Sequence, residues 1–495
     1  MKRKIVAAAM LVFACAAHAD LPKPVAQAFV DAGVPLNSVA LIVQQVGATQ
    51  PLFAHDPTRP MNPASVMKLV TTFAALELLG RDYRWKTEAY LGGPLTDGVL
   101  YGDLVLKGYG DPKITIEQWQ TFMAALRAKG LDRVAGDLAL DRTWFKPSKH
   151  DPAEFDKEPL KPYNVGPDAL LVSFNAVRFV FAPNAAGDAV EMRAEPSLAE
   201  VALGAPPSIS SGDCGDWRGA LGSRFVNRGA TATASFAGSF AASCGERDWY
   251  VALLDHPHFV HGMFTTYFRE AGGQFIGGLR DVRAPSGIPP FVTLESPPLY
   301  DIVRDVNKLS NNVMARQIFL TLATTRYPPP ATPALAADVV QRFLKERKIA
   351  MPGLVLENGS GLSRNERVTA GGLAQLLAAA DRSPAREEFA SSLAVAATDG
   401  TVQRRFQNGT VAGQALLKTG TLDGVKALAG YVIDAQNRRW IVVAIINHPN
   451  AQRGQAALDG LVQWVYRSAA TWDPKAPRCR PPRSLRSRLQ ERSHN

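Results

Sequence analysis

The chain has 495 residues, of which 46% are hydrophobic and 20% charged, and its formal net charge is +10. The composition excludes collagen-like, low-complexity and intrinsically disordered classes, and the length exceeds one ordinary domain. The charge does not indicate nucleic-acid binding, because residues 475–495 hold seven basic residues against Glu491 and the first four residues hold three more, which leaves about +1 for the rest.

The N-terminus, MKRKIVAAAMLVFACAAHAD, is typical of a secretory signal: a basic KRK, an apolar run, and Ala-His-Ala before Asp20. We predict that residues 1–19 are removed and that the mature protein lies in the periplasm. Cys15 raises a lipoprotein alternative, which the bulky Phe13 disfavours. No later apolar stretch reaches the roughly 18 to 20 residues of a membrane span, so we predict no integral membrane span.

Cysteine usage agrees with export to an oxidising compartment. Cys214 and Cys244 enclose a loop rich in Gly, Ser and Ala, and we predict a disulfide between them. Cys479 is left without a partner in the basic tail, residues 471–495. For this tail we favour a solvated, disordered end over a segment that binds anionic lipid or wall polymer.

The patterns in chain order predict two kinds of region. A strand at 38–47, a loop at 51–65 and a helix at 65–80 ended by Gly80 come first, and short strands separated by Gly, Pro and Asp follow from about residue 88 to 285. Helices return at 298–325, from 331 to about 348, and at 368–382 with Thr369 as N-cap. Strands at 414–421, 426–434 and 438–448 suggest an antiparallel meander. The sequence therefore predicts an α/β (α+β) protein interrupted by a long β-rich insertion.

The segment NPASVMKLV places Ser65 and Lys68 three residues apart. With Asn62 as N-cap and Pro63 at the first helical position, Ser65 falls in the first turn of the helix, where backbone N–H groups lack partners and could stabilise an oxyanion. Lys68 lies on the same helix face, within reach of the hydroxyl proton. Alone the pattern is weak, because Ser-x-x-Lys also occurs by chance at ordinary helix starts.

Two later motifs strengthen it. Ser310-Asn311-Asn312 lies between two predicted helices, and Lys418-Thr419-Gly420-Thr421 lies on a predicted strand. Each could be a plain polar loop or strand end. In this order, together with Ser65 and Lys68, they form the motif set of penicillin-binding proteins and β-lactamases, with Asn311 where that set has Asp.

At these motifs the sequence resembles the class C low-molecular-mass penicillin-binding proteins, the D-alanyl-D-alanine carboxypeptidase/endopeptidase family. The resemblance extends over the mature chain to about residue 470. It includes KGYGDP (107–112), PYNVGPDALLVSFNAV (162–177), CGDWR (214–218), ASCGERDW (242–249), NGSGLSR (358–364) and TDGTVQRRF (398–406).

The resemblance implies a serine β-lactamase/transpeptidase-like domain, with a five-stranded antiparallel sheet flanked by helices and a helical part, and two inserted β-rich domains. Its expected organisation is a signal peptide (1–19), the transpeptidase-like domain in two parts (20–87 and 286–470), inserted domain II in two parts (88–176 and 256–285), inserted domain III (177–255) and the tail (471–495).

The resemblance also implies the chemistry. Ser65 would attack the carbonyl of the penultimate D-Ala with Lys68 as base, and the N–H groups of Ser65 and Thr421 would form the oxyanion hole. Ser310 and Lys418 would relay a proton to the leaving amine.

Substrate contacts are implied in the same way. Asn312 would bind the substrate backbone, Thr419 and Lys418 would hold the terminal carboxylate, and Gly420 would let the strand approach the ligand. The site departs from the family pattern at Asn358, where Asp is usual.

The function implied is an exported serine DD-peptidase, a carboxypeptidase and also an endopeptidase, acting on peptidoglycan stem peptides. β-Lactam antibiotics would be covalent inhibitors; no metal, organic cofactor or nucleic acid is implied, and the oligomeric state stays open. An acidic residue of the first inserted domain would meet the amine of the stem peptide, and Asp156 and Glu158 are the two candidates.

Other patterns suggest alternatives. His256, His258 and His261 have ligand-like spacing, but no Glu stands at metalloprotease spacing, so we interpret them as ordinary loop histidines. Ser360 lacks the frame of a nucleophile elbow, and a turn explains it better. A serine β-lactamase or esterase on the same fold, and a catalytically silent wall-binding protein, are the alternative functions.

Overall fold

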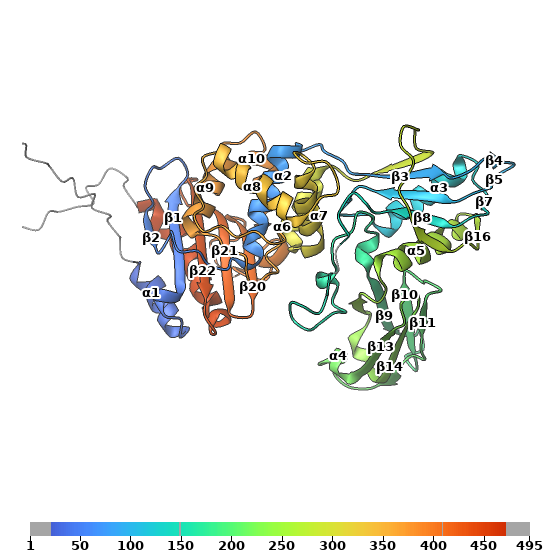
Figure 1. The fold of residues 1–495 in the computed structure, drawn as a ribbon. Coiled ribbons are helices and arrows are strands. Elements are labelled where there is room, and N and C mark those ends of the chain that lie inside the picture. Colours follow the sequence, from blue (N-terminus) through green and yellow to red (C-terminus); the bar gives the residue numbers. More distant parts are fainter. Residues whose placement is uncertain (1–20, 148–149, 408, 472–495) are drawn as a thin grey trace, which may run out of the picture.

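The computed structural model describes residues 21–147, 150–407 and 409–471. The predicted signal peptide, Cys479 and almost all of the basic tail lie outside this described part. Figure 1 shows a large sheet covered by helices at one end of the molecule and the inserted segment at the other. No helix in the described ranges is both long and apolar enough to cross a bilayer.

A six-stranded antiparallel sheet organises the first region, in the order β19-β20-β21-β22-β1-β2. The predicted meander is confirmed as β20, β21 and β22, and β1 pairs with β22 across the start and the end of the chain. The sheet has six strands rather than five, because two short edge strands join it, and β2 lies in a segment predicted to be loop. The strands are β1 (Val39–Gln45), β2 (Phe53–His55), β19 (Ala394–Val395), β20 (Ala415–Leu422), β21 (Val425–Ile433) and β22 (Arg439–Asn447).

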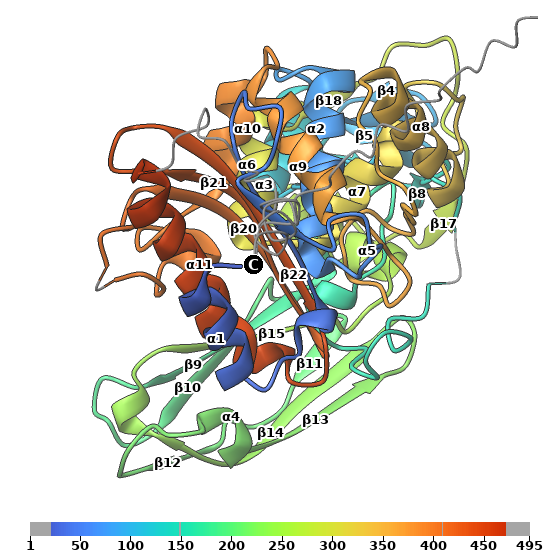
Figure 2. The same cartoon turned by 90° about the vertical axis from the view of Figure 1, so that its left-hand side faces the viewer.

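Helices cover both faces of this sheet, because its central strands are apolar on both sides (Figure 2). Alternate residues divide between two cores: Leu428 and Val442 pack with α1 (Lys23–Asp31) and α11 (Gln455–Ser468), whereas Ala429 and Val443 pack with the opposite helical layer. That layer consists of α2 (Lys68–Leu79), α6 (Leu299–Leu309), α7 (Asn312–Ala323), α8 (Pro333–Glu346), α9 (Ala370–Asp381) and α10 (Arg386–Ser392). This confirms the predicted antiparallel sheet flanked by helices.

The start of the helix that follows Ser65 differs from the prediction. Asn62 does not cap an α-helix; its Oδ1 accepts the N–H of Ala64 at 2.9 Å. Ala64 has a left-handed backbone with φ of 47°, and residues Ala64–Met67 form a 3₁₀ turn, η2, before α2 begins at Lys68. A left-handed residue interrupts a continuous α-helical path, so Ser65 lies in the 3₁₀ turn. Gly80, with φ of 86°, ends α2 as predicted.

The inserted segment contains four smaller sheets between residues 86 and 295. Their strands are β3 (Lys86–Leu91), β4 (Leu95–Thr96), β5 (Val99–Leu100), β6 (Leu104–Gly108), β7 (Arg133–Val134), β8 (Leu138–Asp141), β9 (Val177–Pro183), β10 (Val190–Glu195), β11 (Val201–Leu203), β12 (Ser208–Ser210), β13 (Leu221–Asn227), β14 (Ala232–Ala241), β15 (Arg247–Val251), β16 (Gln274–Phe275), β17 (Leu279–Asp281) and β18 (Val292–Glu295). One continuous core joins buried residues from Ala89 to Val292. The boundaries between two separate inserted domains stay a prediction.

The inserted segment also contains helices. Besides the four-residue α4 (Trp217–Ala220), these are α3 (Ile116–Ala128) and α5 (His256–Glu270). The strand-rich pattern gave no expectation of α3, although a capping box opens it: Thr115 accepts the N–H of Gln118, and Gln118 accepts the N–H of Thr115. Short strands and glycines on both sides obscured this helix signal.

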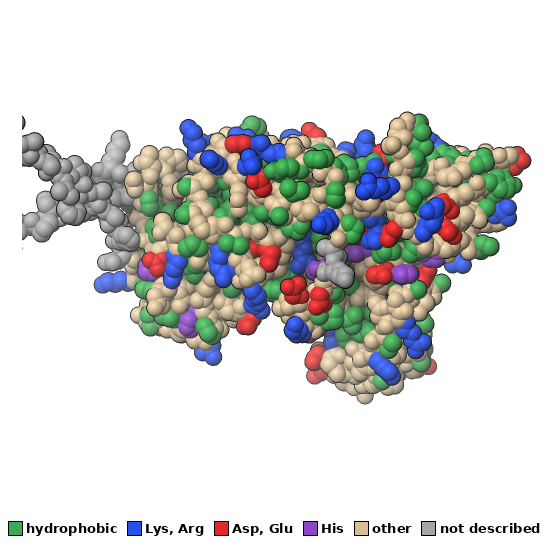
Figure 3. All heavy atoms as spheres, in the orientation of Figure 1, with side chains coloured by type: hydrophobic (Ala, Val, Ile, Leu, Met, Phe, Trp, Pro, Cys, Tyr) green, Lys and Arg blue, Asp and Glu red, His purple; other side chains and the backbone are tan. Residues whose placement is uncertain are grey.

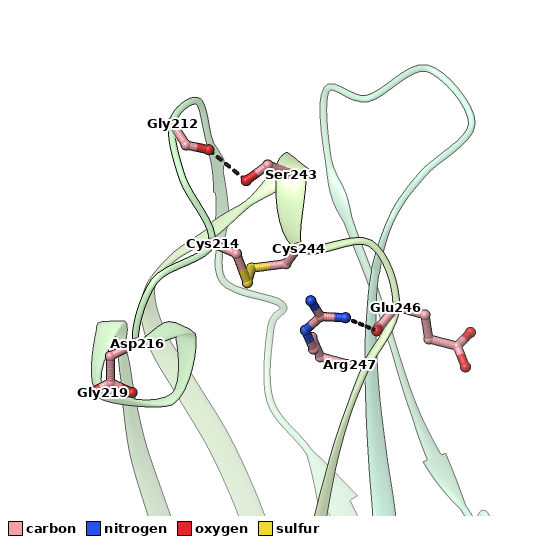
Figure 4. The surroundings of a disulfide bond; sticks show 8 residues. All are labelled: Gly212, Cys214, Asp216, Gly219, Ser243, Cys244, Glu246 and Arg247. Carbon is pink, nitrogen blue, oxygen red and sulfur yellow. Dashed lines mark hydrogen bonds between the residues drawn. A yellow bond between two sulfur atoms is a disulfide. The ribbon is translucent and has the colours of Figure 1, made fainter. Parts of the chain in front are cut away.

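The predicted disulfide is confirmed: Cys214 and Cys244 are bonded (Figure 4). It joins the loop before α4 to the short turn that follows β14, and Ser243 donates a hydrogen bond of 2.6 Å to Gly212 O beside it. The bond therefore fixes a loop at the edge of the β11-β14-β12 sheet.

Candidate active site

Lys68 links three parts of the candidate site. Its Nζ lies 3.0 Å from Ser65 Oγ, 2.6 Å from Asn312 Oδ1 and 2.5 Å from Ser360 O. A carbonyl oxygen can only accept a hydrogen bond, so Asn312 and Ser360 take up the two N–H groups of a neutral amine. The lone pair of that amine is then directed at the Ser65 hydroxyl.

The surroundings of Lys68 favour this neutral form. The side chain is fully buried, and burial lowers its pKa well below the usual range. Lys418 and Arg316 lower the pKa further by charge repulsion, whereas the negative charge of Glu366 acts in the opposite direction. The lowered pKa favours the neutral amine of Lys68, which is the form that can accept a proton.

A second buried lysine faces Ser310. Lys418 Nζ donates to Ser310 Oγ at 2.9 Å and to Thr419 O at 3.0 Å. Burial lowers the pKa of Lys418 to about 7, so this amine can exchange a proton with the Ser310 hydroxyl at neutral pH.

The corner between α6 and α7 presents Ser310 and Asn312. Ser310 has a left-handed backbone with φ of 59° and ends α6. Asn311 is the N-cap of α7, and its Oδ1 accepts the N–H of Met314 at 3.0 Å. Asn311 therefore shapes the corner, whereas Ser310 and Asn312 contact the two lysines.

The β20 residues meet η2 at close range. A Cβ at Gly420 would lie 2.5 Å from Pro63 O and 3.2 Å from Ser65 N. Glycine is thus required by the protein's own backbone, in addition to any approach of a ligand. Along β20, Thr419 and Thr421 share the face opposite to Lys418 and Gly420. The Thr419 hydroxyl donates to Thr401 Oγ1 at 2.7 Å.

A segment that sequence reasoning treated as a plain turn packs directly against Ser65. A Cβ at Gly361 would lie 1.9 Å from Ala64 O and 2.8 Å from Ser65 Cα, and Gly361 has φ of 83°. Asn358 Oδ1 accepts both the N–H of Ser360 at 2.9 Å and the Ser360 hydroxyl at 2.7 Å. The Asn358 amide donates to Leu362 O at 2.9 Å, a bond that an aspartate in this place could not make. The glycines of NGSGLS could have predicted this contact, because a glycine often marks a place where two backbone segments approach closely.

A cleft of about 970 Å³ opens in front of Ser65. Its lining includes Ser65, Ser310, Asn312 and Thr421 from the predicted site and Asp156 from the inserted segment, whereas Glu158 is not part of it. Residues of α3, β9, β10 and β15 in the inserted segment also line the cleft. On the face shown in Figure 3, basic and acidic side chains are interspersed.

The three histidines lie in the first turns of α5, not in a loop, because Asp255 caps that helix. His256 Nε2 lies 3.1 Å from Gly166 O, His258 pairs with Asp255 at 2.7 Å, and His261 pairs with Glu200 at 3.0 Å. Among residues 21–147, 150–407 and 409–471, no cluster of three or more His, Cys, Asp or Glu side chains is arranged to hold a metal ion.

Several known proteins are similar to this chain in sequence or in fold. A D-alanyl-D-alanine carboxypeptidase of Actinomadura sp. (strain R39) is 29% identical over 84% of this chain and 78% of its own length. D-alanyl-D-alanine carboxypeptidase DacB of Haemophilus influenzae is 24% identical over 83% of this chain and 85% of its own length. The crystal structure of penicillin-binding protein 4 (dacB) from Haemophilus influenzae superimposes with a TM-score of 0.72 at 21% identity, covering 89% of this chain and 99% of that one.

The family profile of D-Ala-D-Ala carboxypeptidase 3 (S13) matches residues 21–468, which is nearly the whole described chain. The resemblance inferred from the three motifs is therefore confirmed over the full fold. This chain belongs to the D-Ala-D-Ala carboxypeptidase 3 (S13) family of peptidases.

Proposed function

We propose that the protein is an exported serine DD-peptidase that cleaves D-Ala bonds of peptidoglycan stem peptides through an acyl-enzyme on Ser65. Terminal D-Ala would be removed in a carboxypeptidase reaction, and D-amino-acid cross-links would be cleaved in an endopeptidase reaction. The observation that carries the proposal is the position of the buried Lys68 amine. It donates hydrogen bonds to Asn312 Oδ1 and Ser360 O, and its third contact is Ser65 Oγ.

The first step is acylation. Lys68 takes the proton of Ser65 as Oγ attacks the carbonyl carbon of the penultimate D-Ala. The N–H groups of Ser65 and Thr421 receive the oxyanion, and the close packing of Gly420 against Pro63 and Ser65 supports this arrangement by bringing the two backbones together.

The leaving amine needs a proton when the tetrahedral intermediate collapses. Ser310 and Lys418 supply it, since their 2.9 Å hydrogen bond connects a hydroxyl on the cleft surface to a buried amine with a pKa of about 7. The same Lys418 charge, together with the Thr419 and Thr421 edge of β20, attracts the terminal carboxylate. Carboxylate binding favours the protonated form of Lys418 and so prepares it as the acid.

The remaining contacts orient the substrate. Asn312 uses its Oδ1 for Lys68, so its amide N–H₂ is directed to a carbonyl of the substrate backbone. Asp156 receives a cationic amine of the stem peptide. Burial acts to raise the pKa of this carboxyl, but hydrogen bonds from Tyr163, Asn164 and the N–H of Glu158 outweigh it and lower the pKa, so Asp156 is negatively charged at neutral pH.

The export and the reactivity toward penicillin are parts of the same proposal. The signal-like residues 1–19 support export, and the Haemophilus influenzae penicillin-binding protein 4 that shares this fold has been crystallised with a β-lactam.

The test is the intact mass of the purified protein with and without benzylpenicillin, followed by peptide mapping. We expect one stable addition on the peptide that carries Ser65, and none in Ser65→Ala. An addition retained in Ser65→Ala would contradict the nucleophile assignment. Destruction of the antibiotic without a stable adduct would favour a β-lactamase, and an intact antibiotic without adduct would favour a silent wall-binding protein.

A further inference from the structure

A buried carboxylate lies beneath the segment that contacts Lys68, and the roles proposed above do not use it. Glu366 is 0% exposed, and its Oε1 accepts the backbone N–H groups of Glu357, Asn358 and Gly359 at 3.1, 3.0 and 2.8 Å. Its Oε2 accepts the N–H of Gly361 at 2.9 Å. Successive N–H groups that converge in this way form an anion-binding nest. Here the anion is a side chain of the protein itself.

The segment held by Glu366 runs along the turn and helix that carry Ser65. Three hydrogen bonds connect the two: Thr71 Oγ1 to Gly359 O at 2.6 Å, Lys68 Nζ to Ser360 O at 2.5 Å, and Asn62 Nδ2 to Ser363 O at 2.8 Å. Between the last two, Gly361 is in contact with the backbone of Ala64 and Ser65. The carboxylate therefore determines where the Ser360 carbonyl meets Lys68.

Burial raises the pKa of Glu366, whereas its backbone N–H hydrogen bonds act to lower the pKa and stabilise the ionised form. The negative charge of that form is opposite in sign to the charges around it. The titratable groups that face Lys68 are Lys418 on β20, Arg316 on α7 and Glu366. Arg316 is a cation at neutral pH, and Lys418, with a pKa of about 7, becomes one as the pH falls. When Lys68 accepts the Ser65 proton, an ammonium forms on a fully buried side chain close to Arg316 and Lys418. A buried cation in such a place requires a compensating anion.

We propose that Glu366 is a positioning residue for acylation: its carboxylate holds the Ser360 carbonyl against Lys68 and supplies the counter-charge for the ammonium that forms there. This inference rests on the proposed function. In the step concerned, the Ser65 O–H bond breaks and its proton joins Lys68 Nζ, while an Oγ electron pair forms the bond to the carbonyl carbon and the carbonyl π pair becomes the oxyanion. On collapse, the electron pair of the C–N bond leaves with the amine, which takes up a proton.

The test is the acylation rate constant of Glu366→Gln with benzylpenicillin, measured by intact mass from pH 5 to 9. Glutamine has nearly the same shape, but it carries no charge and its amide N–H₂ faces backbone N–H groups. We expect acylation to slow by about 10- to 100-fold, the scale of a misplacement near the reacting atoms. We also expect the acidic limb of the pH profile to move to lower pH by about 1 unit, because Lys68 loses the anion that favours its protonated form.

Two further variants separate position from charge. Asn358→Ala loosens the same segment but keeps the carboxylate, so it should slow acylation and leave the acidic limb in place. Glu366→Asp keeps the charge but shortens the side chain by one methylene, so it no longer reaches the segment fully. This variant should also acylate more slowly and leave the acidic limb in place. If Glu366→Gln does not fold, as judged by circular dichroism, the Asp variant carries the test, and acylation at the wild-type rate in it would overturn the inference.

Other results are equally decisive. A folded Glu366→Gln protein that acylates like the wild type, or that acylates slowly with an unmoved acidic limb, would leave Glu366 as a structural residue and overturn the inference. An unlabelled wild type would instead overturn the proposed function, and the inference would fall with it.

Discussion

Replacement of Lys418 by methionine is expected to stabilise the folded protein at neutral pH and, at the same time, to abolish acylation of Ser65. Lys418 is fully buried, and burial alone lowers its pKa from 10.5 to about 7. The folded state therefore favours the neutral amine, whereas the unfolded chain carries the charged one at pH 7. Methionine has a similar length and no charge to bury.

The magnitude follows from the difference in pKa. A difference of this size corresponds to about 4 kcal/mol of unfolding free energy at pH 7 and below. The variant also loses two hydrogen bonds, to Ser310 Oγ and Thr419 O, which are worth about 1 kcal/mol each. The expected net gain is thus about 2 to 3 kcal/mol.

The pH dependence has a definite sign. A folded-state pKa below the unfolded value makes a stability contribution that is present above pH 10.5 and is lost as the pH falls through about 7. The advantage of methionine is therefore largest at pH 7 and below and shrinks as the pH rises toward 10.5.

Differential scanning calorimetry at pH 7 and pH 10 measures this gain, in parallel with benzylpenicillin labelling. For the roughly 450 residues that the structure describes, the unfolding entropy is about 1 kcal/mol per degree, so we expect a rise in melting temperature of about 2 to 3 °C at pH 7. Lys426→Met, at a half-buried lysine on β21, is the control and should gain less. A Lys418→Met protein that melts below the wild type at pH 7 would refute the reasoning.

Three further predictions concern other groups. Asp111 is buried with Oδ2 unpaired, and burial raises its pKa to about 7, so the stability that this group contributes below pH 4 is lost as the pH rises to 7. Asp111→Asn should therefore be more stable than the wild type by up to about 4 kcal/mol at pH 8 and by little at pH 4. Urea denaturation measures both differences, and equal gains at the two pH values would contradict the prediction. The double variant Cys214→Ser, Cys244→Ser removes the disulfide and should lower the free energy of unfolding by about 3 to 4 kcal/mol. The reduced wild type is the control, and an unchanged denaturation midpoint in the variant would contradict this prediction. Asp156→Asn should lower kcat/KM by about 10-fold or more for stem peptides with a free side-chain amine but not for N-acetylated ones, and equal losses for both would exclude Asp156 as the amine receptor.

Local structure was predictable wherever neighbouring residues decide it. Gly80 ends α2 and Thr369 caps α9, because both effects act within one helical turn. The short apolar runs of β20 to β22 predicted the meander for the same reason. The capping box of α3 was an equally local signal, but the surrounding strands and glycines outweighed it. The edge strands β2 and β19 have three and two residues, too few for any periodic pattern.

The 3₁₀ turn at Ser65 was out of reach of such reasoning. Its left-handed Ala64 is an unfavourable backbone state that no local preference selects. It persists because β20 and the Gly361 segment hold the turn on two sides, at distances where even a Cβ would not fit.

The sequence by itself determined which reactive side chains the protein has and, except for Ser65, on or beside which elements they lie, because helix and strand patterns act over a few residues. Tertiary structure decided how they are paired: Lys68 meets Asn312 across 244 positions and Ser360 across 292, and Lys418 meets Ser310 across 108. It also decided their protonation, because the desolvation that lowers the pKa of both lysines exists only when the sheet, the helices and the Glu366 segment close around them.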